Sequence, residues 1–338
     1  MPIPGPLQDY AAQLGYAGSE TLGRIFEILF EGDDVARLVA ALPGTAGEVA
    51  ARSGLPEKTV AELGTRLLMR GRIIVDFKKN NMFRRFPALI ELRDSSVLDP
   101  DTTQELFELW EKLVVRESGP MVDGLRSRSV SPMVRVIPIE RSVQAQNTVL
   151  DVDSARKIFR DAALITVIPC VCRTIAKRNG RGQDCPAPET SVCMQTNFFA
   201  TGVLARKAGE KISAAEALKR IAAAEDAGLV HMVRNNVKKD MFMCNCCACC
   251  CTGLHFYHHL HYPGVLAPSR FRVRLEPELC TACGVCADRC QFHAISLQDD
   301  LASIDLENCM GCGNCVITCP EQALALEEIR PLEHIRVK

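Results

Sequence analysis

Apolar residues in the first quarter of the chain recur at helical spacing between residues that start and stop helices. Thr45 and Glu48 form a T-x-x-E capping box, which predicts the start of a short helix. Gly54 follows as its expected terminator, and Pro56 lies near the first turn of the next helix. The pattern therefore predicts two consecutive short helices, the second of which ends before Gly71.

Short extended runs of apolar residues come next. Residues 73–77 predict a strand, 78–81 a polar turn and 82–86 a return strand. Two helices followed by such a hairpin resemble a winged-helix domain, which we place at residues 1–95.

The predicted hairpin is locally basic. A basic patch of this kind can neutralise nucleic-acid phosphates or dock an acidic protein. The helix after Pro56, however, carries the acidic residues Glu57 and Glu62 where a DNA-reading helix would approach phosphates. We therefore expect a protein partner here and do not expect nucleic acid. Between 66 and 85 a single acidic residue, Asp76, accompanies seven basic residues: Arg66, Arg70, Arg72, Lys78, Lys79, Arg84 and Arg85.

Helical spacing returns from 99 to 115. Leu106, Leu109, Trp110 and Leu113 fall on one face of a helix in this segment. The stripe predicts an amphipathic helix that packs into a core or docks on another element. We assign residues 96–150 to a helical connector.

The middle of the chain reads as strands and helices joined by irregular loops. The apolar run before Pro169 predicts a buried strand that breaks at that proline. Glycine and proline mark an irregular loop over 180–188, and Ser213 with Glu216 caps a helix that ends at Gly228.

The last sixty residues contain two copies of one cysteine spacing, C-x2-C-x2-C-x3-C. Bacterial two-cluster ferredoxins hold two [4Fe-4S] clusters with this run, and the fourth thiolate of each run ligates the other cluster. Zinc sites instead favour separated C-x2-C pairs. Pro320 follows the second run as the motif expects, whereas Gln291 stands where the first run would have proline. The predicted ligand sets are Cys280, Cys283, Cys286 and Cys319 for one cluster, and Cys309, Cys312, Cys315 and Cys290 for the other.

From about Arg270 onward the chain thus resembles a bacterial-type two-cluster ferredoxin domain, which we place at 269–338. The resemblance implies a pseudo-twofold fold of two short hairpins and two short helices.

The chain has eighteen cysteines, and the ten outside the tail all lie between 170 and 251. Six of them crowd into eight consecutive positions, which no ordinary core requires, and exposed thiols in such a run would oxidise. We expect at least one further iron-sulfur cluster, with zinc as the alternative, because soft thiolates select either. These candidate ligands, in a cysteine-rich domain at 151–268, are Cys170, Cys172, Cys185, Cys193, Cys244, Cys246, Cys247, Cys249, Cys250 and Cys251.

Four histidines follow the crowded cysteines. Spacings of three and four would place His255, His258 and His259 on one helical face, and His261 comes shortly after. Aromatic residues interleave them, so we expect a packed surface in preference to a metal site.

Residues 134–138, 170–173 and 244–247 occur in an order that resembles a group of multi-cluster ferredoxin-domain proteins from anaerobes. The crowded C-N-C-C block is the most specific part of that resemblance, which covers about two thirds of the chain. It implies electron carriage in anaerobic metabolism.

Composition narrows the setting. The formal net charge is −1 and 47% of residues are hydrophobic, which is typical of soluble globular domains. The apolar run at 162–172 is about half of what a membrane helix needs, so we expect no membrane insertion. Abundant cysteine with no visible export signal indicates reduced thiols and a cytoplasmic protein.

The sequence therefore predicts an α+β multidomain protein with a winged helix, a cysteine-rich middle and a ferredoxin tail. We expect an iron-sulfur electron-transfer subunit, or a dedicated partner, of a larger oxidoreductase. The chain shows no dinucleotide or nucleotide-phosphate motif, so its redox partner could be a flavoprotein in a hetero-oligomer. Two alternatives are an oxidoreductase with an open-site cluster in the middle domain and a redox-sensing winged-helix regulator.

Overall fold

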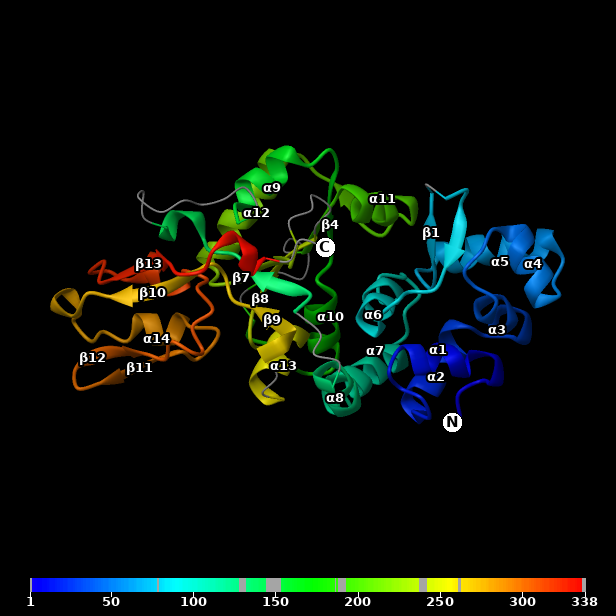
Figure 1. Ribbon diagram of the computed structural model, residues 1–338, viewed down its shortest axis with the longest axis horizontal. Coiled ribbons are helices and arrows are strands. Elements are labelled where there is room, and N and C mark those ends of the chain that lie inside the picture. The colour runs from blue at the N-terminus through cyan, green and yellow to red at the C-terminus, as the bar shows by residue number, and fades with distance from the viewer. Residues whose placement is uncertain are drawn as a thin grey trace. The chain divides into compact units, whose positions relative to one another are not determined.

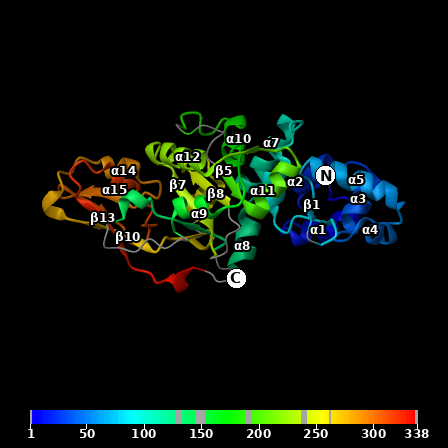
Figure 2. The same ribbon diagram turned by 90° about the horizontal axis from the view of Figure 1, so that it is seen from above.

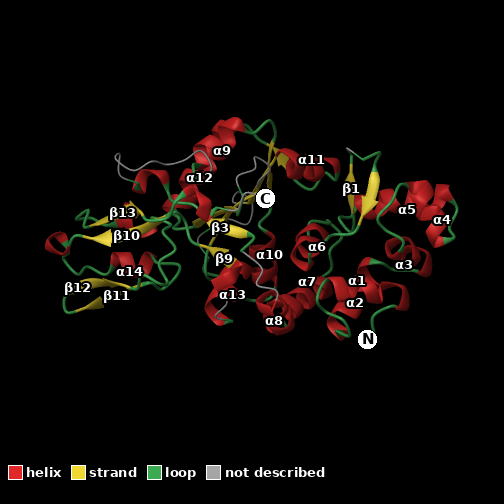
Figure 3. Cartoon of the chain, in the orientation of Figure 1, coloured by secondary structure: helices red, strands yellow, loops and turns green. Residues whose placement is uncertain are grey.

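Helices dominate the amino-terminal part of the chain, and the rest mixes helices with most of the strands (Figure 3). The mixture confirms the predicted α+β class. The computed structural model (Figure 1) describes residues 2–77, 79–127, 132–143, 153–185, 187, 193–236, 242–260 and 263–335. These residues form two units, one of 1–129, 171–181 and 202–208, and one of 130–170, 182–201 and 209–338. Within the described ranges, no helix is long and apolar enough to span a membrane.

The first unit is a set of short helices with one hairpin. Its helices, in chain order, are a 3-10 turn at Gly5–Leu7, α1 (Gln8–Gln13), α2 (Glu20–Leu29), α3 (Asp33–Ala40), α4 (Ala46–Ser53), α5 (Glu57–Met69), α6 (Leu89–Ser96), α7 (Gln104–Glu111) with a π-helical end at Lys112–Arg116, α8 (Gly119–Ser127) and α10 (Val171–Arg178). Its strands are β1 (Ile74–Asp76) and β2 (Met82–Arg84).

The predicted start and stop signals of α4 and α5 are confirmed. Thr45 accepts from the Glu48 amide at 3.4 Å, and the Glu48 side chain accepts from the Thr45 amide at 2.8 Å. Gly54 ends α4 in the left-handed region. β1 and β2 pair antiparallel, and a Cβ on Gly64 would overlap the Phe83 ring, so glycine lets the hairpin pack closely on α5. The elements match the expected order, and the winged-helix assignment remains a prediction.

The amphipathic segment predicted at 99–115 begins as a helix only at Gln104. Thr102 donates its amide to the Asp99 carbonyl at 3.0 Å and forms a turn, after which the Thr103 hydroxyl caps α7. Leu106 and Trp110 are buried as the helical stripe predicts. The start of α7 is therefore determined by local capping, and its buried face by the spacing of its apolar residues.

The second unit is built on a seven-stranded sheet, seen from two directions in Figures 1 and 2, in the order β6-β4-β5-β8-β7-β3-β9. All neighbours pair antiparallel except β3 and β9, which are parallel. The strands are β3 (Val134–Val136), β4 (Ile165–Ile168), β5 (Cys193–Thr196), β6 (Glu210–Lys211), β7 (Val230–Arg234), β8 (Phe242–Cys246) and β9 (Leu266–Ala267). Associated helices are α9 (Ala155–Asp161), α12 (Ala214–Asp226) and α13 (Thr252–His259), with 3-10 turns at Glu140–Ser142 and Pro263–Val265. Helix α11 (Asn197–Ala205) begins in this unit, and its residues from Gly202 onward belong to the first.

The two faces of this sheet have different cores. Val233 and Met243 belong to a core with Phe159 of α9 and Ile221 of α12. Cys246, one of the crowded thiols, lies instead in a second core that includes α13 and the tail. Because side chains alternate along a strand, β8 directs its cysteines to this second face.

The tail adds two small two-stranded sheets. β10 (Phe271–Leu275) pairs with β13 (Leu324–Glu328), β11 (Ile295–Gln298) pairs with β12 (Leu301–Ile304), and α14 (Val285–Arg289) and α15 (Asn314–Thr318) are the short helices. The expectation of two hairpins is wrong in one respect, since β10 and β13 are the two ends of the segment and only β11 and β12 form a hairpin. Further 3-10 turns lie at Pro277–Leu279 and Leu332–His334.

Buried charges join the tail to the large sheet. Asp153 is fully buried and accepts from Arg135 of β3 at 2.7 Å and from Arg270 at 3.3 Å. Arg270 also binds Glu328 of β13. Burial raises the pKa of Asp153, and the two guanidinium groups oppose that rise.

We predict that Asp153→Asn destabilises the second unit by about 3–5 kcal/mol, because it removes the charge that two buried guanidinium groups share. The measurement is anaerobic denaturant unfolding of the metal-loaded chain. Asp123→Asn is the control, since Asp123 forms an exposed pair with Arg126 at 3.5 Å and exposed pairs contribute about 0–1 kcal/mol. Equal effects of the two substitutions would contradict the prediction.

Candidate metal centres

The two cysteine runs of the tail are folded in the same way. Each run has positive φ two and four residues after its first cysteine, at Ala282 and Gly284 in the first run and at Gly311 and Gly313 in the second. A Cβ on Gly311 would overlap the Phe271 carbonyl, so glycine is required there. Each run thus curls its loop before entering a five-residue helix.

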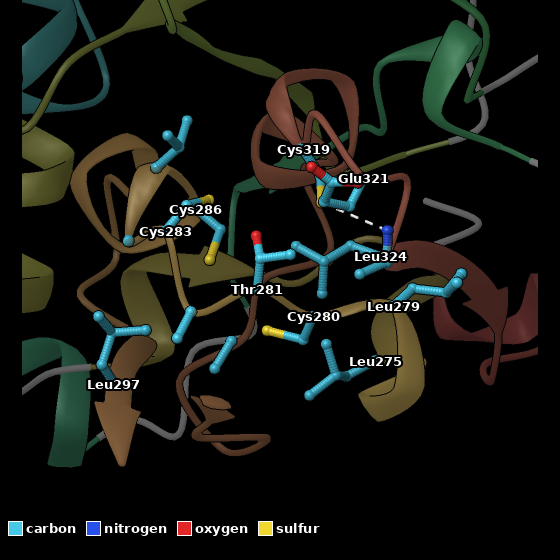
Figure 4. Close-up of a pocket in the computed structure, with 15 residues that line it drawn as sticks. Leu275, Leu279, Cys280, Thr281, Cys283, Cys286, Leu297, Cys319, Glu321 and Leu324 are labelled. Carbon is cyan, nitrogen blue, oxygen red and sulfur yellow. Dashed lines mark hydrogen bonds between the residues drawn. The ribbon is translucent and has the colours of Figure 1, made fainter. Parts of the chain in front are cut away.

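Four cysteines of the tail line one cavity, which Figure 4 shows in close-up: Cys280, Cys283, Cys286 and Cys319. Cys319 comes from the second run and joins the three thiols of the first, as its place in the motif predicts. The Ala323 amide donates to Cys319 Sγ at 3.3 Å. Leucine side chains complete the lining, namely Leu275, Leu279, Leu297 and Leu324.

The other four tail cysteines also gather across the two runs. The Cys290 thiol of the first run interacts electrostatically with Cys312 and Cys315 of the second, and with Cys309. The Ala294 amide donates to Cys290 Sγ at 3.3 Å, in the same relation as Ala323 to Cys319.

Four of the eight tail thiols are poorly hydrated. Burial raises the pKa of Cys312 to about 12 and also raises the pKa values of Cys286, Cys290 and Cys315, with neighbouring thiols adding to each rise. Soft sulfur donors whose pKa values are raised by burial fit a positively charged metal core, which takes the place of their protons.

Comparison with known families indicates which kind of metal centre these cysteines bind. Residues 272–325 match the family model described as the 4Fe-4S dicluster domain. All eight tail cysteines fall within the match, so the chain carries an iron-sulfur domain of the ferredoxin type. No curated protein and no solved structure matches the chain.

The ten cysteines of the middle segment fall into three sets. We call the first the strand set, because three of its members lie on strands β5 and β8. We call the second the loop quartet, because three of its members lie in one turn after β8. The strand set consists of Cys170, Cys193, Cys244, Cys246 and Cys251, and the loop quartet consists of Cys185, Cys247, Cys249 and Cys250. Cys172 makes up the third set alone. All ten are thiols that form no disulfide.

The strand set surrounds Cys244. In the sheet Cys193 of β5 lies opposite Cys244 of β8, and hydrogen bonds from Cys193 and Cys246 lower the pKa of Cys244 to about 7. Cys170, just after the strand break at Pro169, and Cys251 both interact with Cys244 electrostatically. The break at Pro169 is confirmed, because β4 ends at Ile168.

The loop quartet is tighter. All four sulfur atoms lie within 4.8 Å of one another. Cys185 and Cys247 are 3.4 Å apart, and Cys249 and Cys250 are 3.7 Å apart. Burial and nearby thiols raise the pKa of Cys249 to about 12.

Cys172 lies in the first unit, on α10. Arg93 of α6 is buried and donates to Cys172 Sγ at 3.3 Å. Burial raises the pKa of the adjacent Asp94 to about 6, while the Arg93 guanidinium opposes the rise. Neither α6 residue was a candidate from the sequence, because their proximity depends on tertiary packing.

Some of these histidines make packing contacts, such as the His255 and His259 rings, whose centroids are 4.6 Å apart. α13 does place His255, His258 and His259 on a helix, and the His258 ring hydrogen-bonds the Gln291 carbonyl at 2.9 Å. Within the described ranges, no group at single-ion spacing includes a histidine. His261 lies outside those ranges.

Several of the basic side chains near the hairpin have partners inside the first unit. Arg70 pairs with Asp99 at 2.8 Å, and Arg72 donates to the Leu29 carbonyl at 2.6 Å. Arg85 lies over the Tyr10 ring at 5.1 Å. Lys78 is outside the described residues. These contacts hold the three side chains within the first unit, and the expectation that nucleic acid is not the partner remains a prediction.

Gln291 has a role that the motif departure alone did not reveal. Its side-chain oxygen accepts from the Ala248 amide at 2.8 Å, inside the turn that carries the loop quartet. Proline at this position could not make that hydrogen bond.

We predict that Gln291→Ala speeds hydrogen exchange of the Ala248 amide about fivefold, since a hydrogen bond contributes about 1 kcal/mol. Iron content should not change. Gln298→Ala on β11 is the control and should leave that amide protected. Unchanged exchange in Gln291→Ala would show that the turn is held by other contacts.

Proposed function

We propose that the protein is an iron-sulfur electron carrier that serves as a subunit or dedicated partner of a larger oxidoreductase. One observation carries the proposal. Cysteines of the dicluster domain and of the strand set lie in a single continuous apolar core, among them Cys286, Cys309, Cys315, Cys246 and Cys251. Centres held by these cysteines would share one core, which would favour electron exchange between them.

In this proposal the tail holds two [4Fe-4S] clusters, each of which accepts and releases one electron when bound. Cys280, Cys283, Cys286 and Cys319 hold the first, and Cys309, Cys312, Cys315 and Cys290 hold the second. The cavity of Figure 4 and the charge interactions around Cys290 support these sets. The amides of Ala294 and Ala323 aim at sulfur and stabilise the negative charge that reduction adds.

The strand set would hold a further iron-sulfur cluster. Four of its five thiols surround the fifth, Cys244. The Asn245 side chain, between two cysteines, points elsewhere and hydrogen-bonds His231 at 2.5 Å. The sheet thus separates thiols from polar packing by strand alternation. A cluster held by these thiols would add a redox centre on the face of the sheet that shares a core with the tail.

Electrons would enter or leave at the first cluster. Cys283 is an exposed cysteine, and Leu279, Val285 and Leu297 around the same cavity are 50%, 40% and 47% exposed. Exposed apolar side chains beside a redox centre suit transient docking of a redox protein, for which a flavoprotein is our candidate.

Paired substitutions test the ligand sets. Cys280→Ala with Cys319→Ala removes two ligands from one proposed cluster, and we predict a loss of about four irons with one unaltered cluster spectrum remaining. Cys280→Ala with Cys290→Ala removes one ligand from each cluster and should leave neither spectrum unaltered. The measurement is iron analysis with electron paramagnetic resonance of the reduced, anaerobically purified chain.

The opposite pattern would mean that each run holds its own cluster. A wild-type chain with fewer than about eight irons, or one that takes up no electrons, would overturn the proposed function.

The docking site has its own test. Leu279→Glu with Leu297→Glu should abolish anaerobic co-purification of a redox protein with the tagged chain from the native host, without changing iron content. Leu306→Glu is the matched control, because Leu306 is 46% exposed but does not line the cavity. Equal recovery with both variants would place docking elsewhere.

A further inference from the structure

The loop quartet differs from every other thiol set in the protein by its spacing. Its sulfur atoms all lie within 4.8 Å of one another, and it is the one group of metal-ligating side chains in the described ranges that meets this limit. The eight tail cysteines are all described, and they do not meet it. They provide an internal standard for how this fold spaces the ligands of iron-sulfur clusters.

The distances between four sulfur ligands depend on the size of the metal centre that they bind. A tetrahedral zinc ion has Zn–S bonds of about 2.3 Å, which places its sulfur ligands about 3.8 Å apart. A [4Fe-4S] cluster gives each thiolate a separate corner iron and so holds the sulfurs farther apart. The Cys185–Cys247 and Cys249–Cys250 separations of 3.4 and 3.7 Å match a single ion.

We propose that Cys185, Cys247, Cys249 and Cys250 bind one structural zinc ion and no iron-sulfur cluster. All four ligands are protein thiolates, which leaves no open position and is typical of structural zinc sites. The inference is independent of the proposed electron transfer, because zinc carries no electrons in either case.

The backbone is shaped for this site from both sides. The Cys251 amide donates to the Cys247 carbonyl at 3.0 Å, which turns the chain so that three thiols within four positions converge. The Ala248 amide inside that turn is held by Gln291 at 2.8 Å. On the other side, the Cys185 amide donates to the Gly182 carbonyl at 3.2 Å. Cys185 is thus brought from a loop sixty-two positions away.

The close approach of Gly182 to Cys250 is a second feature that fits this site. Its φ is +60°, and a Cβ there would overlap the Cys250 sulfur. Gly180, two residues earlier, also has positive φ, at +78°, but a Cβ there would meet nothing within 4 Å. The thiol of Cys250 therefore occupies the space that a side chain at 182 would fill.

Metal analysis of the full chain, purified without oxygen from cells supplied with both iron and zinc, tests the proposal. We expect one zinc per chain in addition to iron and sulfide. Cys249→Ser should lose that zinc and keep its iron. Cys283→Ser, an equally exposed cysteine of the tail, should lose iron and keep its zinc.

X-ray absorption at the zinc edge of the wild-type chain gives a readout that does not depend on a variant folding. Four sulfurs at about 2.3 Å with no neighbouring metal are expected. Loss of iron and sulfide from Cys249→Ser, or a single iron in place of zinc, would overturn the assignment.

Substitutions of Gly182 and Gly180 provide a test variant and its matched control. Gly182→Ala should weaken zinc retention against a chelator by about 10- to 100-fold, as loss of supporting contacts around a metal does. Gly180→Ala suffers the same backbone strain and should retain zinc like the wild type. Equal zinc loss from both would show that strain alone, without contact with Cys250, is responsible.

Discussion

A thiolate in an apolar core is costly unless a positive charge shares its site, because the protein interior solvates an anion poorly. The second unit places many cysteines under this constraint at once. Burial raises the pKa values of Cys312 and Cys315, and Cys246 and Cys251 lie in the same core. Since metal binding to such thiols releases protons and supplies the missing charge, we expect folding of this unit to be coupled to metal binding. The apolar residues and the metal centres are parts of one core.

The same constraint bears on how the six cysteines within eight adjacent positions divide into two sets of thiols. β8 ends at Cys246, whose side chain follows strand alternation into the core, and the turn beyond it directs Cys247, Cys249 and Cys250 toward Cys185. Cys251 then returns toward Cys246 at the start of α13. One change of backbone direction divides this run of thiols between two sets, in which only Cys249 is exposed.

The tail is held to the large sheet by polar groups as well as by apolar packing. Asp153 links Arg135 and Arg270, and the Asn314 side chain donates to the Gly228 and Leu229 carbonyls at 3.3 Å each. Buried polar groups of this kind demand specific partners, so they fix the register between the elements they join. The ferredoxin-type domain is thereby anchored in the same unit as the large sheet.

The sequence by itself determined whatever depends on local chemistry. The capping box at Thr45, the strand break at Pro169 and the repeated spacing of the tail cysteines each act within a few residues, and the last was enough to predict an iron-sulfur domain. Sequence could not divide the ten middle cysteines, because their grouping depends on the strand register that sets Cys193 opposite Cys244 and on the loop that brings Cys185 to Cys247. Long-range pairing, which no local pattern encodes, decided which thiols share a site.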